Sequence, residues 1–134
     1  MAGGTTIRIA GGLALALACV GRPALAAEPS VRELYQDCRV ADGAGTPAAW
    51  APGEEARAVR CASYLEGMAH VLNLNCLLVR RGVMGGEVPA ADVAGADTAA
   101  LVRAFLAWAG RHPEELDEHR SVAGVALVEA FPCR

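Results

Sequence analysis

The chain contains no lysine, and its 12 arginines are outnumbered by 15 acidic residues. The formal net charge is therefore −3, and the sequence offers no basic stripe of the kind that binds nucleic acid. This balance argues against DNA or RNA as a partner. A charged ligand, if the protein has one, is expected to be basic.

The motifs of common metal, redox and catalytic sites are absent as well. No two cysteines form C-x-x-C, which excludes a thioredoxin-like redox centre, haem attachment and the usual zinc spacings. The three histidines, His70, His112 and His119, form neither H-x-x-x-H nor H-E-x-x-H. No nucleophile, base and metal ligands assemble, so we expect no enzyme activity, no metal and no cofactor.

The first residues have the pattern of a secretory signal peptide. Arg8 precedes an apolar stretch over residues 9–20, and Ala24-Leu25-Ala26 supplies small residues at the cleavage site. The apolar stretch is shorter than the roughly 20 residues that a membrane-spanning helix needs. We expect residues 1–26 to be cleaved, with Cys19 among them. Residues 27–134 then form a single periplasmic domain, which is more acidic than the precursor.

Four cysteines remain after cleavage, which predicts two disulfides in an exported chain of this size. Residues 54–80 are expected to form one helix that carries both Cys61 and Cys76. Their separation is about 22 Å, whereas a disulfide needs Cα atoms within about 7 Å. Two pairings remain open: Cys38–Cys61 with Cys76–Cys133, or Cys38–Cys76 with Cys61–Cys133. We favour the first, because helices that follow each other in sequence usually pack as neighbours.

Helical periodicity is clearest in the first half of the chain. Ser30 and Glu33 form a capping box that opens the first helix. In the helix over residues 54–80, Glu66, His70 and Asn73 lie opposite an apolar seam made of Ala58, Cys61, Leu65, Met68, Leu72, Cys76 and Val79. Gly67 costs about 1 kcal/mol relative to alanine in a helix. We interpret it as a site where a neighbouring helix packs closely.

Two further helices complete the expected fold. The third runs from Asp97 or Thr98 to Arg111. At His112-Pro113 the chain either breaks or starts a helix again, because proline is suited to the first turn of a helix. The stretch from Val122 to Phe131 is almost wholly apolar, so the fourth helix is expected to be buried there, and Pro132 ends it. An acidic run follows Pro113 and consists of Glu114, Glu115, Asp117 and Glu118. It is either a binding patch or, as we favour, a first turn whose carboxylates interact favourably with the positive end of the helix dipole. No alternating strand and no internal repeat occurs. The sequence therefore predicts an all-α fold, a small disulfide-stapled four-helix bundle.

Two loops are candidates for contact with a partner protein. Trp50 lies between two prolines in the first loop and could anchor an interface, although a lid over the core is the favoured alternative. In the loop over residues 82–95, Val83 and Met84 are followed by Gly85 and Gly86. This tip could insert into a cleft, or the loop could be an ordinary connector.

Four motifs in order resemble the Rap/Tai family (the Rap1a-like immunity protein domain), small periplasmic immunity proteins that neutralise type VI secretion amidase toxins. They are Leu34-Tyr35-x-x-Cys38, Cys61-x-x-Tyr64-x-x-Gly67, His112-Pro113-Glu114 and Ala126-Leu127-x-x-Ala130-Phe131-Pro132-Cys133. The resemblance covers residues 34–133. It implies a helical protein, often a homodimer, that occludes a peptidoglycan amidase by surface complementarity and has no catalytic residues of its own.

The chain departs from the family pattern before the third helix. Members often have C-x-P there, whereas this chain has Gly86-Glu87-Val88-Pro89, and its third cysteine is Cys76. Because of this departure, the resemblance alone does not give the second disulfide, the shape of the loop after it or the class of toxin. The rival hypothesis is a small periplasmic helical stress chaperone or adaptor, which would bind unfolded clients through apolar surface.

Overall fold

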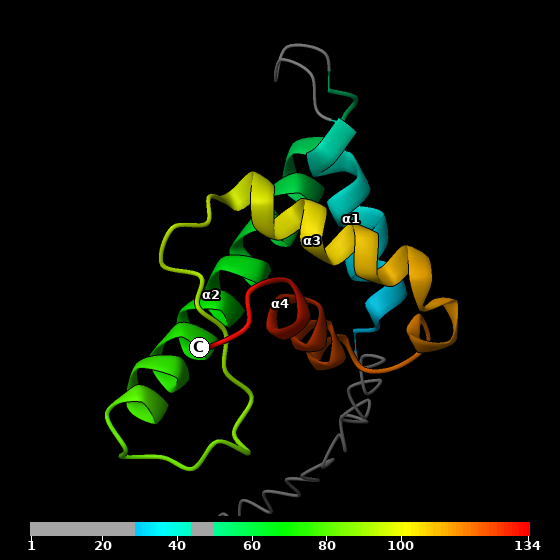
Figure 1. Cartoon of the computed structure of the whole chain (residues 1–134). Helices are drawn as coiled ribbons and strands as arrows, with labels where there is room; N and C mark the ends of the chain where they lie inside the picture. Colours follow the sequence, from blue (N-terminus) through cyan, green and yellow to red (C-terminus); the bar gives the residue numbers. More distant parts are fainter. Residues whose placement is uncertain (1–28, 44–49) are drawn as a thin grey trace, which may run out of the picture.

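The computed structural model describes residues 29–43 and 50–134. The expected signal peptide and residues 44–49 of the first loop lie outside this part. The helices are α1 (Val31–Gly43), α2 (Glu54–Arg80), α3 (Thr98–Arg111) and α4 (Gly124–Ala130), with 3-10 turns at Pro113–Glu115 and Arg120–Ala123 (Figure 1). Among the described residues there are only two isolated β-bridges and no strand. The predicted all-α class and the bounds of α2 are confirmed.

The N-terminal ends of α1 and α3 are fixed by the side chains that the sequence suggested. The hydroxyl of Ser30 accepts a hydrogen bond from Glu33 N at 3.3 Å, and Glu33 accepts one from Ser30 N at 3.2 Å. The carboxylate of Asp97 accepts from Ala100 N at 2.7 Å. Each of these bonds satisfies a backbone donor that has no partner within its helix.

The core lies where α3 crosses α1 and α2, with α4 packed beside them (Figure 1). Phe105 of α3, Leu65 of α2 and Leu127 of α4 are fully enclosed. Five residues of α3 are buried, which confirms its central position: Leu101, Val102, Phe105, Trp108 and Ala109. Apolar side chains from all four helices are buried together in one cluster. Their removal from water is the main contribution to the stability of the fold.

Of the two alternatives at Pro113, a break or a new helix, the chain takes the break, because only a 3-10 turn forms at Pro113–Glu115. The fourth helix, α4, lies within the apolar stretch from Val122 to Phe131, as expected. The carbonyl of Leu116 accepts a hydrogen bond from Arg32 N at 2.7 Å, and that of Glu118 accepts one from Val31 N at 2.9 Å. These carbonyls serve the N-terminus of α1 and cannot continue a helix. The chain is extended at His119, and α4 is only seven residues long.

The acidic run after Pro113 is used within the fold. Asp117 forms an ion pair with Arg32 of α1 at 2.9 Å, which lowers the pKa of the Asp117 carboxyl from its usual value. Glu114 accepts from His112 at 3.0 Å. The run is therefore neither the first turn of an α-helix nor a cluster free of partners.

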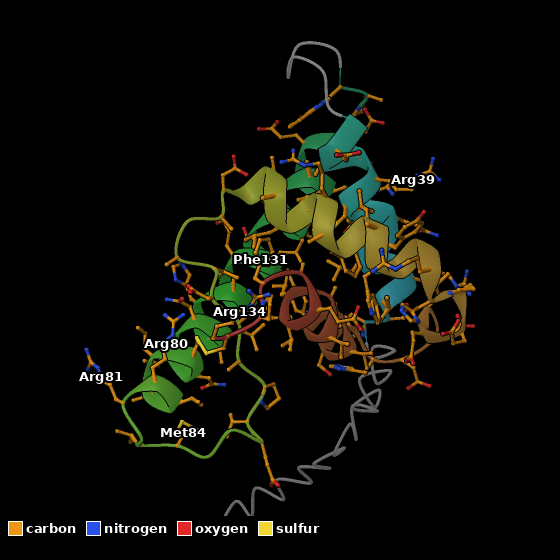
Figure 2. All side chains as sticks on the ribbon, viewed as in Figure 1. Arg39, Arg80, Arg81, Met84, Phe131 and Arg134 are labelled. Atoms are coloured by element: carbon orange, nitrogen blue, oxygen red, sulfur yellow. A yellow bond between two sulfur atoms is a disulfide. The ribbon has the colours of Figure 1, made fainter. Side chains whose placement is uncertain are left out.

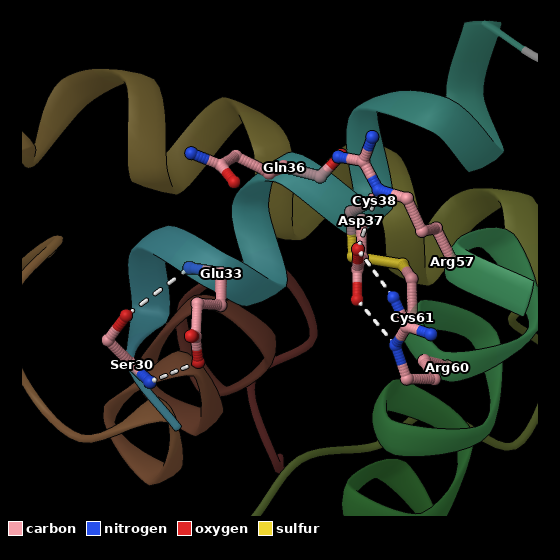
Figure 3. A network of polar contacts seen from close by, with 8 residues as sticks. All are labelled: Ser30, Glu33, Gln36, Asp37, Cys38, Arg57, Arg60 and Cys61. Atoms are coloured by element: carbon pink, nitrogen blue, oxygen red, sulfur yellow. Dashed lines mark hydrogen bonds and ion pairs between the residues drawn. A yellow bond between two sulfur atoms is a disulfide. The ribbon is translucent and has the colours of Figure 1, made fainter. Parts of the chain in front are cut away.

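Two disulfides join the helices, Cys38–Cys61 and Cys76–Cys133, with Cα atoms 5.0 and 5.5 Å apart. This is the pairing favoured from the order of the helices. The first links α1 to α2 beside Asp37, which accepts from Arg57 at 2.9 Å and from Arg60 at 3.0 Å (Figure 3). The second links the far half of α2 to the C-terminal tail. Both ends of α2 are therefore held covalently.

Candidate partner-binding surface

An apolar groove runs between the second half of α2, α4 and residues 86–90. Its volume is about 700 Å³. Among the described residues, its lining is mostly aliphatic and includes Met68, Val71, Val79, Val88, Val125, Val128 and Pro132. A concave surface of this size and composition suits an apolar segment of a partner.

The floor of the groove depends on a glycine. A Cβ atom placed on Gly124, at the start of α4, would lie 3.1 Å from Sδ of Met68. A real Cβ contact is seldom so short, so the missing side chain allows Met68 to lie between α2 and α4. Gly124 has ordinary helical backbone angles, and its role is therefore one of space.

The walls of the groove are tied to α2 by several polar contacts. Asn75 donates to the carbonyl of Pro89 at 2.8 Å. Arg80 donates to Asp92 at 2.6 Å and to the backbone oxygen of Arg134 at 2.7 Å, and Figure 2 shows Arg80 beside Arg134. The hydrogen bond and the charge of Arg80 lower the pKa of the Asp92 carboxyl. With the Cys76–Cys133 bond, these contacts hold the tail and the loop against one helix.

Apolar side chains also point away from the body of the molecule along α2. Val71, Leu74 and Leu77 are 60%, 55% and 41% exposed. Exposed aliphatic residues gathered on one element are typical of an interface. We did not expect this from the inward seam of α2. The signal was present in residues 71–79, where every residue except Asn73 and Asn75 is apolar, which is more than one inward face of a helix can hold.

The Gly-rich candidate loop follows α2 directly, at the end of α2 that Figure 2 marks with Arg81 and Met84. Gly82 has φ +70°, a conformation that glycine adopts without strain. Val83 is 68% exposed, whereas Met84 is half-buried. Gly86 lines the groove and Gly85 does not. The structure therefore places part of this loop at the groove.

Trp50 lies at the opposite end of α2, which is 27 residues or about 40 Å long. It is half-buried, and its indole Nε1 is enclosed with no hydrogen-bond partner among the described residues. The structure does not bring Trp50 together with the loop at Val83. The two candidates cannot belong to one small site.

The remaining polar clusters have structural explanations. Glu66, His70 and Asn73 line a shallow pocket at the start of α3, where Thr98 donates to Glu66. Arg120 lies over the ring of Tyr64, 4.5 Å from its centroid. No group of three His, Cys, Asp or Glu residues in the described part could hold a metal ion. None of the described helices is both long and apolar enough to span a bilayer.

Comparison with known proteins gives one match. Residues 30–133 match the family model of the Rap1a immunity proteins, while no curated protein and no solved structure matches the chain. The match spans most of the sequence, so the chain belongs to the Rap1a immunity protein family. It is thus an immunity protein, and its partner is a secreted toxin.

Proposed function

From this membership, we propose that the protein neutralises a peptidoglycan amidase toxin of type VI secretion in the periplasm. The family match over residues 30–133 carries the proposal. Removal of residues 1–26 as a signal peptide would deliver residues 27–134 as one domain to the compartment where such a toxin acts. Both disulfides suit an oxidising compartment.

The inhibitor acts by steric occlusion, with the groove and the adjoining loop as the contact surface. Val71 and Val125 are exposed at the groove, and Val83 is exposed at the loop. An apolar segment of the toxin packs between α2 and α4, which covers the entrance to its active site. This mechanism requires no catalytic residue on the inhibitor.

The test uses the mature chain and the toxin encoded beside its gene. The two proteins should form a stable complex, and the amidase should lose its activity on purified peptidoglycan. Val125→Glu, at the groove, should weaken inhibition at least about tenfold, equivalent to 1.4 kcal/mol of binding free energy. Ala107→Glu on the exposed side of α3 is the matched control and should inhibit normally.

Two outcomes would reject this proposal. An active amidase in the presence of excess mature protein would reject the function. Equal inhibition by the Val125→Glu variant and the control would reject the groove as the contact surface. A homodimer, which the family resemblance implies, is part of the proposal and can be measured without the toxin.

The rival function is a stress chaperone, which the exposed Val71 and Leu74 would also suit. A chaperone should suppress aggregation of several unrelated unfolded proteins at low pH. An immunity protein should instead bind one toxin in a fixed ratio and leave unfolded clients unprotected. The two readouts separate the hypotheses.

A further inference from the structure

A polar pocket lies between α1, the N-terminal part of α2 and the 3-10 turn at Arg120–Ala123. Its volume is about 490 Å³. Three arginines and two acidic residues are among the residues that line it: Arg57, Arg60, Arg120, Glu33 and Asp37. The pocket is therefore net positive, in a chain whose formal charge is −3. We call it the arginine pocket. The acidity of the whole chain favours a basic ligand, whereas the local charge of this pocket favours an acidic one.

The carboxylates of the arginine pocket do not use up its arginines. Asp37 is mostly buried, and its two oxygens accept from Arg57 and Arg60 at 2.9 and 3.0 Å (Figure 3). The other carboxylate, that of Glu33, caps α1. Arg60 donates to Asp37 through Nε and Nη2, which leaves its Nη1 without an acceptor in the described part of the chain. The side chain of Arg60 is 60% exposed, so this donor can reach a ligand.

Arg120 supplies a third positive charge that has no counter-ion. Its guanidinium carbon lies over the ring of Tyr64, 4.5 Å from the centroid. That contact holds the guanidinium in place but uses none of its N–H donors. Burial raises the pKa of the Tyr64 hydroxyl, against the opposing charge of Arg120, so the ring stays neutral. Arg120 forms no ion pair with any residue that the structure describes.

The arginine pocket adjoins the apolar groove on both sides of their common border. Arg120 lines the pocket, and the next residue in the chain, Ser121, lines the groove. On α2, Arg60, Tyr64 and Met68 are four residues apart and so lie along one side of the helix. Met68 belongs to the groove. The two sites are therefore parts of one surface.

Gly67 keeps the path between the two sites open. It lies in the interior of α2, where glycine is unfavourable relative to alanine. Its φ is not positive, and a Cβ atom placed on it would meet nothing within 4 Å. The interpretation that a neighbouring helix of the same chain packs closely on Gly67 is therefore wrong. A shallow hollow surrounds it instead, lined by Ser63, Tyr64, Met68 and Val71, and this hollow leads from Tyr64 to the groove.

We infer that the arginine pocket binds a carboxylate of the toxin, carried by the same segment whose apolar residues occupy the groove. The planar fork of arginine matches the two oxygens of a carboxylate. Between Arg60 and Met68, α2 rises about 12 Å, a distance that about four residues of an extended chain span. The toxin segment thus has an Asp or Glu at about that spacing from its first apolar anchor. This inference rests on the groove of the proposed function and adds the acidic anchor that selects the segment.

The experiment is isothermal titration calorimetry of the mature, oxidised chain with the toxin encoded beside its gene. Arg120→Gln removes the charge without a counter-ion and should weaken binding at least about tenfold, the effect of one hydrogen bond between charged groups. Arg60→Gln should act in the same way, while Arg57 still neutralises Asp37 and keeps the fold. Arg103→Gln, on the exposed side of α3, is the matched control and should bind normally. Sodium chloride should weaken binding of the wild type more than binding of the Arg120→Gln variant.

A double-mutant cycle identifies the carboxylate. Each exposed Asp and Glu of the toxin is replaced by its amide and titrated against the wild type and against Arg120→Gln. One replacement should weaken binding to the wild type at least about tenfold and change binding to the variant little, because the pair is already broken there. The inference fails when no toxin carboxylate is coupled to Arg120 in this way, or when both arginine variants bind with wild-type affinity.

Gly67→Gln tests the path between the pocket and the groove. Glutamine favours a helix more than glycine does, so Tm should not fall, while the side chain fills the hollow and should weaken binding about tenfold. Unchanged affinity of this variant would overturn the single segment. Sensitivity of binding to Val125→Glu but not to Arg120→Gln would overturn only this inference. A toxin that binds as described but has no amidase activity would overturn only the proposed function.

Discussion

Removal of one disulfide at a time should separate the stability of the bundle from the integrity of the groove. The bonds close loops of 23 and 57 residues. The chain-entropy model assigns them about 3.4 and about 4.2 kcal/mol, respectively. On loop length alone, the pair Cys76→Ala and Cys133→Ala should therefore destabilise the protein more than the pair Cys38→Ala and Cys61→Ala.

The structure predicts the reverse order for the free energy of unfolding. Cys38 and Cys61 are both fully enclosed at the contact of α1 with α2, so their removal loosens the packing of the core. Most of the chain between Cys76 and Cys133 is held by α3 and α4 within the core. Loss of this bond should release mainly the tail after Phe131, at a cost well below about 4.2 kcal/mol.

Thermal unfolding followed by circular dichroism tests the order. Loss of the Cys38–Cys61 bond should lower Tm by at least about 14 to 27 °C, from about 3.4 kcal/mol and the usual ratio for a small domain. Loss of the Cys76–Cys133 bond should lower Tm by less, yet it should speed hydrogen exchange at Ala91 and Asp92, whose backbones contact the tail and α2. An equal or larger fall in Tm for the second variant would refute the reasoning.

Three further predictions concern the core, the ion pair of Arg80 with Asp92 and the groove. Phe105→Ala removes a fully buried ring and should cost about 3 to 5 kcal/mol in denaturant unfolding; a loss below about 1 kcal/mol would contradict the assigned core. The pKa of Asp92 is lowered from 3.8 by Arg80. The ion pair of Asp92 with Arg80 therefore stabilises the fold above pH 3.8, and this stabilisation is lost as the pH falls through the lowered pKa of Asp92. Hydrogen exchange at Asp92 should accelerate over that range, and Asp92→Asn should abolish this dependence. Gly124→Val should push Met68 into the groove and weaken toxin inhibition about tenfold with little change in Tm; unchanged inhibition would argue against the groove.

Much of the fold could be predicted because its signals are local. The capping box at Ser30 and the cap at Asp97 each involve residues three apart in sequence. The bounds of α2 follow from a long unbroken pattern that ends at Gly82. In these elements the sequence around a residue determines its hydrogen bonds, so no knowledge of tertiary packing is needed.

The segment between α3 and α4 could not be predicted in the same way. Pro113 and the acidic residues after it favour a helix locally, but the carbonyls of Leu116 and Glu118 bind the distant N-terminus of α1. The groove could not be predicted from local sequence either, because its walls come from α2, α4 and residues 86–90. The exposure of Leu74 depends on which side of α2 the other helices cover. These are relations between segments far apart in sequence.

The single helix that carries Cys61 and Cys76 also shapes how the bonds can form. In an unfolded chain, cysteines only 15 residues apart meet more often than any of the other pairs here, because short loops close at the lowest entropic cost. Once α2 has formed, a bond between Cys61 and Cys76 becomes impossible, because the helix holds the two residues too far apart. Oxidation is thereby channelled away from the commonest mispaired isomer, and the forming helix itself guides the chemistry toward the native bonds.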